Sequence, residues 1–186
     1  PDSFARDLYA RWFTVLRNSL ALGLGMLVVQ PMPAATWLTN SPLLNARQGH
    51  TATLLPNGKV LIAGGYVDNG IGGTNRAELF DPATMSFTAT GSMASARDRA
   101  TATLLPDGRV LIAGGFGSNG AILRSAEIYD PATGRFSSAG NMRAERAYHT
   151  ATPLGDGRIL IAGGLVANGD GLSSAEIFNP DSGNFS

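Results

Sequence analysis

The segment Ala96-Arg-Asp-Arg-Ala-Thr-Ala-Thr-Leu-Leu-Pro-Asp-Gly-Arg-Val-Leu-Ile-Ala-Gly-Gly115 decides the fold, because closely similar segments occur once before it and once after it. The arginines Arg47, Arg97 and Arg146 mark the same position in each copy, so the copies are spaced by 50 and 49 residues. A repeat of this length predicts a chain built from copies of one supersecondary unit.

Each unit predicts four short strands separated by turns. In the first unit, a strand at 51–55 is followed by a Pro-Asn-Gly turn at 56–58, which is a hairpin signal. The second strand, at 59–63, is apolar on both faces after Lys59 and ends at a glycine pair, where the missing Cβ permits a sharp bend and close approach of backbone. A variable loop, a strand at 76–80, an acidic-Pro turn and a strand containing Phe87 complete the unit.

Four strands in about 50 residues, repeated along the chain, are typical of the blades of a β-propeller. We therefore expect an all-β fold with about three blades, at 46–95, 96–144 and 145–186, the last blade being cut at its fourth strand. Each blade has two apolar faces, and stacking the blades buries both. The residues expected in the core are Leu54, Val60, Ile62, Leu79 and Phe87, with their equivalents.

The glycine pair, the acidic-Pro turn and the aromatic residue of the fourth strand resemble the kelch family over about residues 36–186. The resemblance implies that the strand at 51–55 lines a central channel and that the strand containing Phe87 lies outermost. Trp37 lies 50 residues before Phe87, so residues 36–45 are expected to form an outermost strand of a neighbouring or closing blade.

Three blades are too few for a closed ring of about 4–8 blades. We therefore expect the chain to be part of a longer propeller, with further blades beyond Ser186. The alternative is that two copies assemble into a six-bladed ring.

Residues 1–35 have the pattern of a secretory signal peptide. Arg11 and Arg17 precede an uncharged apolar run at 20–29, and small residues follow at Ala34 and Ala35. The run is short for a membrane span of about 20 residues, so we expect cleavage and no stable span, with an uncleaved anchor as the alternative. This segment predicts a secreted or extracytoplasmic protein.

Composition narrows the function. The chain has 14 basic and 14 acidic residues, and this balance argues against nucleic acid as a partner. The absence of cysteine excludes disulfides, thiolate metal sites and a cysteine nucleophile within these 186 residues. No arrangement of catalytic residues is visible, so a catalytic role is not expected.

Candidate binding residues lie in the loops after the glycine pairs, which differ between units. Loops on a rigid scaffold commonly carry binding residues, so we expect Tyr66, Asp68, Phe116 and Asp170 to contact a ligand, either protein or carbohydrate. Asp68 and Asp170 are also possible Ca²⁺ ligands, although their spacing lacks a calcium-loop pattern.

Residues that recur in every unit are expected to serve the blade. The repeated carboxylates are Glu78, Glu127 and Glu176. We expect each to bond backbone groups or to pair with the repeated arginine of its unit.

Tyr148 and His149 suggest a different function. Their segment resembles the part of galactose oxidase that supplies adjacent Tyr and His copper ligands, which implies copper at these two residues. That family also needs a cysteine-crosslinked tyrosine, and the chain contains no cysteine. The favoured hypothesis is therefore an exported binding or scaffold module without a cofactor. The alternatives are a copper radical oxidase with its remaining ligands elsewhere, and a structural module of the cell envelope.

Overall fold

The computed structural model describes residues 41–67 and 73–186. The expected signal peptide at 1–35 and the candidate ligand Asp68 lie outside the described residues, as does most of the strand expected at 36–45. Within the described ranges the chain forms strands, bends and turns, and none of its helices is long and apolar enough to cross a membrane.

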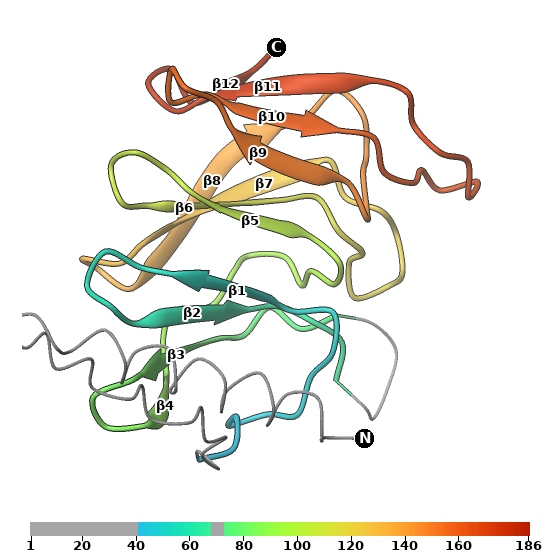
Figure 1. Cartoon of the computed structure of the whole chain (residues 1–186). Helices are drawn as coiled ribbons and strands as arrows, with labels where there is room; N and C mark the ends of the chain where they lie inside the picture. Colours follow the sequence, from blue (N-terminus) through green and yellow to red (C-terminus); the bar gives the residue numbers. More distant parts are fainter. Residues whose placement is uncertain (1–40, 68–72) are drawn as a thin grey trace, which may run out of the picture. The chain divides into compact units, whose positions relative to one another are not determined.

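The described strands form three four-stranded antiparallel sheets, one for each sequence repeat (Figure 1). Blade 1 contains β1 (Thr51–Leu54), β2 (Val60–Ala63), β3 (Ala77–Asp81) and β4 (Ser86–Ala89). Blade 2 contains β5 (Thr101–Leu104), β6 (Val110–Ala113), β7 (Ser125–Asp130) and β8 (Arg135–Asn141). Blade 3 contains β9 (Thr150–Pro153), β10 (Ile159–Ala162), β11 (Ala175–Asn179) and β12 (Asn184–Phe185). The all-β prediction with propeller-type blades is confirmed.

The aromatic residue of the fourth strand pairs with an aromatic residue on the neighbouring third strand. Phe87 of β4 lies opposite Phe80 of β3, with ring centroids 4.9 Å apart. The corresponding pair in blade 2, Tyr129 and Phe136, has centroids 4.8 Å apart. Aromatic cross-strand pairs stabilise a sheet, so this fixed offset in the sequence fastens the outer strand of each blade to the strand beside it.

The two faces of the second strand pack against different neighbours. Leu61 of blade 1 belongs to the same cluster as Val110 and Ile112 of blade 2. Leu111, the equivalent of Leu61, belongs instead to the cluster shared with Ile159 and other residues of blade 3. Successive side chains of a strand point to opposite faces, so β6 contributes to the core on both sides of its sheet.

The glycine pairs allow close contact between neighbouring blades. A Cβ on Gly114 would lie 2.3 Å from the carbonyl oxygen of Arg146, and a Cβ on Gly64 would lie 2.3 Å from the carbonyl oxygen of Arg97. Both glycines have positive φ, at 63° and 67°. Only glycine satisfies both demands, which confirms the expected close approach of backbone at the end of the second strand.

The inner strands lie side by side, β1 next to β5 and β5 next to β9 (Figure 1). The prediction that Leu54 belongs to the core is wrong, because this residue is 63% exposed. β1 pairs only with β2, and no described residue covers the side of β1 on which Leu54 lies. The next residue, Leu55, is 2% exposed and packs in the core between blades 1 and 2.

Candidate functional site

One end of the blades, here called the loop end, combines two kinds of segment. The connectors 47–50, 97–100 and 146–149 lead into the inner strands, and each lies beside the loop that follows a glycine pair. In blade 2 the backbone N–H of Asp98 donates to the carbonyl of Phe116 at 2.9 Å, and the Phe116 N–H donates back at 2.7 Å. Backbone pairing therefore fixes where connector side chains sit relative to loop side chains.

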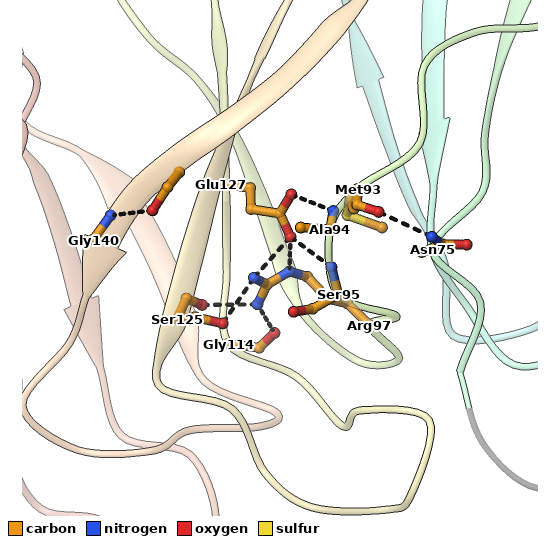
Figure 2. A network of polar contacts seen from close by, with 10 residues as sticks. Asn75, Met93, Ala94, Ser95, Arg97, Gly114, Ser125, Glu127 and Gly140 are labelled. Atoms are coloured by element: carbon orange, nitrogen blue, oxygen red, sulfur yellow. Dashed lines mark hydrogen bonds and ion pairs between the residues drawn. The ribbon is translucent and has the colours of Figure 1, made fainter.

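The repeated arginine and glutamate form a buried network beneath this surface (Figure 2). The Arg97 guanidinium donates to the carbonyls of Gly114 at 2.9 Å and Ser125 at 2.7 Å, and to Glu127 at 3.1 Å. Glu127 also accepts the backbone N–H of Ala94 at 2.7 Å. The network joins the connector arriving from blade 1 to two strands of blade 2.

The same network recurs in the other blades. Arg146 donates to Glu176 at 3.0 Å, and Arg47 pairs with Glu78. Burial alone would raise the pKa of Glu176, but the backbone N–H groups of the connector and the Arg146 guanidinium outweigh burial and lower it. These contacts confirm the prediction that the repeated carboxylates serve the blade.

Side chains peculiar to single blades gather above this network. The Arg99 guanidinium carbon lies 5.2 Å from the ring centroid of Tyr148 and 5.9 Å from that of Phe116. The two rings meet edge to face, with centroids 5.9 Å apart. These distances fit cation–π and aromatic pairing. We call Arg99, Phe116 and Tyr148 the aromatic–arginine cluster.

The backbone holds this cluster in an uncommon conformation. Arg99 and Tyr148 have φ of 52° and 58°, and the equivalent residue of blade 1 is Gly49, with φ of 65°. The Arg99 N–H donates to the Gly49 carbonyl at 3.0 Å, and the Tyr148 N–H donates to the Arg99 carbonyl at 3.3 Å. This chain of bonds between blades imposes the left-handed conformation, which costs a side chain about 1–2 kcal/mol. Tyr148 is nevertheless 56% exposed.

Asp98 completes the surroundings of Arg99. Its Oδ2 lies 2.5 Å from Arg99 Nη1, and the residue is 3% exposed. Its Oδ1 is buried and has no hydrogen-bond donor among the described residues. Burial raises the pKa of the Asp98 carboxyl, and the charge of Arg99 offsets this in part.

His149 lies in different surroundings from its neighbour Tyr148. Its Nε2 lies 2.9 Å from Thr101 Oγ1, and its Nδ1 is buried without a partner among the described residues. Burial, and then the charge of Arg146, lower the pKa of His149 to about 4. In the described part of the chain no three His, Cys, Asp or Glu residues are placed to hold a metal ion. Copper at Tyr148 and His149 stays a prediction.

The predicted loop residues are only partly brought together. Phe116 lies in the aromatic–arginine cluster, whereas half-buried Tyr66 is held by backbone pairing to Gln48 in blade 1. Asp170 closes its own turn, because its N–H donates to Asn168 Oδ1 at 3.0 Å. Ligand binding at Tyr66 and Asp170 therefore stays a prediction.

Sequence reasoning missed Arg99 and Asp98. The signal was present at two adjacent repeat positions, which hold Gln48, Asp98 and Ala147, and then Gly49, Arg99 and Tyr148. Residues so different at one position indicate that the blade does not need any one of them. Comparing repeats position by position along the connectors would have found them.

The opposite end of blades 2 and 3, here called the turn end, holds a groove of about 680 Å³. Its charged residues include Asp107 with Arg109 and Asp156 with Arg158, each pair joined by an exposed ion pair of 2.6 Å. These pairs repeat at the same turn in both blades, so they serve the turns and make the turn end a useful control surface.

The model of the kelch motif matches residues 100–143, which contain most of blade 2. The chain carries kelch repeats. The solved structure of YjhT, a kelch-type propeller protein, resembles this kelch-repeat chain with a TM-score of 0.71 at 14% sequence identity. The match covers 81% of this chain and 54% of that one, so the kelch-repeat chain spans about half the length of YjhT. Comparison with curated protein sequences gave no match.

Proposed function

We propose that this kelch-repeat chain is an exported recognition module that binds a protein or carbohydrate ligand through its loop end. The observation that carries the proposal is the aromatic–arginine cluster. It places an exposed tyrosine, a stacked arginine and a phenylalanine together, on a scaffold that needs none of these residues for its repeated contacts.

The residue types suit recognition. Tyrosine and arginine are enriched among the residues that dominate binding energy in protein interfaces. Tyrosine offers a large contact surface at low cost in conformational entropy. Tyr148 is held by the backbone bond to Arg99 and by the edge of Phe116, so little freedom remains to be lost on binding.

The backbone conformation of the cluster also supports a role in recognition. Arg99 and Tyr148 occupy left-handed positions where blade 1 has glycine. Strained residues of this kind cluster at ligand-binding sites and persist where the surrounding structure fixes them. The left-handed conformation of Arg99 and Tyr148 costs free energy, and their side chains make no contact that is repeated in every blade, which supports a role of these residues in binding.

Export is proposed from the signal-peptide pattern of residues 1–35. Fractionation of the producing cells, followed by mass determination, tests it directly. The mature protein should lie outside the cytoplasm and lack about 35 residues. Full-length protein retained in the cytoplasm contradicts export and leaves the binding proposal intact.

Binding is tested by applying the purified chain to a printed panel of glycans and to an array of random 15-residue peptides. We expect signals on one of the two panels, abolished by Arg99→Ala combined with Tyr148→Ala. The control is Arg109→Ala combined with Arg158→Ala at the turn end, which should bind like the parent protein. The proposal is contradicted by two blank panels, or by signals that the loop-end variant retains.

A further inference from the structure

We infer that the ligand of the aromatic–arginine cluster is a neutral saccharide. This inference rests on the proposed function and narrows its ligand to one chemical class. It follows from three properties of the site: an exposed aromatic surface, hydrogen-bond donors at its edge, and charges that offset one another.

Tyr148 provides the aromatic surface. It is 56% exposed although its ring contacts both Phe116 and Arg99. A pyranose ring is about the size of a phenol ring and carries a face of C–H groups, so it can cover the exposed part of Tyr148. The fixed backbone of Tyr148 means that the platform is formed before the ligand arrives.

Arg99 supplies polar groups beside that platform. The guanidinium has five N–H donors, and among the described residues its only side-chain acceptor is Asp98, through Nη1. Asp98 Oδ1 has no donor in the described structure, but it is buried against Gly49 of blade 1, where an added Cβ would lie 2.1 Å from it. It is therefore out of reach of a ligand that covers Tyr148. Hydroxyl groups accept hydrogen bonds, so the hydroxyls of a sugar can accept from the remaining N–H groups of Arg99.

The charges select against ionic ligands. Asp98 repels an anion that approaches Arg99, and Arg99 repels a cation that approaches Asp98, because the two lie in direct contact. A neutral polyhydroxylated ligand meets neither penalty. The same contact disfavours an acidic or a basic peptide at this position, which favours a saccharide over a charged peptide.

The experiment titrates the full chain with neutral glucose, galactose and mannose and their β-linked tetramers, by calorimetry and saturation-transfer NMR. Glucuronate and glucosamine serve as matched anionic and cationic versions of glucose. We expect at least one neutral sugar to bind with a Kd below about 10 mM, and both charged versions to bind more weakly than glucose.

Variants then assign the site. Tyr148→Ala should weaken sugar binding at least about tenfold, whereas Tyr148→Phe, which keeps the ring, should stay within about twofold of the parent chain. Asp98→Asn removes the charge that repels anions, so the ratio of glucuronate to glucose affinity should rise.

Each remaining outcome overturns the inference. No neutral sugar binding by the folded parent chain removes the saccharide class, and peptide binding that depends on Tyr148 would then leave the proposed function standing. Sugar binding that survives Tyr148→Ala places the saccharide elsewhere on the molecule. Absence of both sugar and peptide binding overturns the inference and the proposed function together.

Discussion

Arg97 Nη2 lies 3.1 Å from Glu127 Oε1, and the two side chains are only 1% and 6% exposed. Removing one partner of such a pair leaves an uncompensated buried charge, which costs about 3–5 kcal/mol. We therefore expect Glu127→Gln to lower the free energy of unfolding in urea by about 3 kcal/mol. The control Asp107→Asn breaks an exposed ion pair and should cost at most about 1 kcal/mol. Equal losses in the two variants would contradict the structural role of the network.

Gly114 and Gly169 test the close approach between blades. Both have positive φ, at 63° and 84°, but a Cβ on Gly114 would meet the Arg146 carbonyl whereas a Cβ on Gly169 would meet nothing within 4 Å. Gly169→Ala should cost about 1 kcal/mol for backbone strain alone. Gly114→Ala should cost about 3 kcal/mol, because overpacking adds to the strain. Thermal unfolding of both variants measures the difference, and similar costs would mean that blades 2 and 3 are not in tight contact.

Leu54 and Leu61 test which face of the first blade is buried. Leu61 is 1% exposed in the core shared with blade 2, whereas Leu54 is 63% exposed on β1. Leu61→Ala should lower the free energy of unfolding by about 2–5 kcal/mol, and Leu54→Ala should change it by less than about 0.5 kcal/mol. A large loss from Leu54→Ala would show that this residue is covered in solution.

His149 should make stability depend on pH. Its pKa is about 4 in the folded chain against an ordinary value of 6.5, so the unfolded chain takes up the proton first as the pH falls. Stability therefore declines from about pH 6.5 down to about pH 4, by at most about 3 kcal/mol. His149→Gln keeps a polar group near Thr101 and removes this titration. The difference between the parent and variant stability curves checks it, and parallel curves would show that His149 is not buried neutral.

The sequence predicted most of the fold because the same types of residue recur at the same positions in each unit. Three kinds of residue have the same local contacts in every blade: the aromatic residue of the fourth strand, the second glycine of the pair and the repeated glutamate. Their occurrence in three copies distinguished the pattern from chance. Leu54 was wrongly assigned because an apolar residue in a strand is usually buried. The burial of Leu54 depends on which segment packs against that face of the inner strand, and the residues of the strand itself do not show this.

The candidate site was less predictable for a related reason. Phe116 and Tyr148 were both identified from the sequence, but their contact depends on how blade 2 packs against blade 3. Arg99 was missed because its importance comes from two rings in different segments and from a left-handed backbone that bonds between blades impose. These contacts have no local sequence signal, and only the differences between units at two adjacent repeat positions, one of which holds Gly49, Arg99 and Tyr148, mark the site in the sequence.

The central claim is that repeated residues hold the blades while blade-specific residues bind the ligand. Its most direct test is Tyr148→Gly, because glycine is the residue that blade 1 has at this position, as Gly49. Unfolding and binding to the glycan and peptide panels are measured on the same preparation. We predict an unfolding free energy unchanged or raised by up to about 1 kcal/mol, together with loss of binding. Retained binding, or a stability loss of more than about 2 kcal/mol, would contradict the claim.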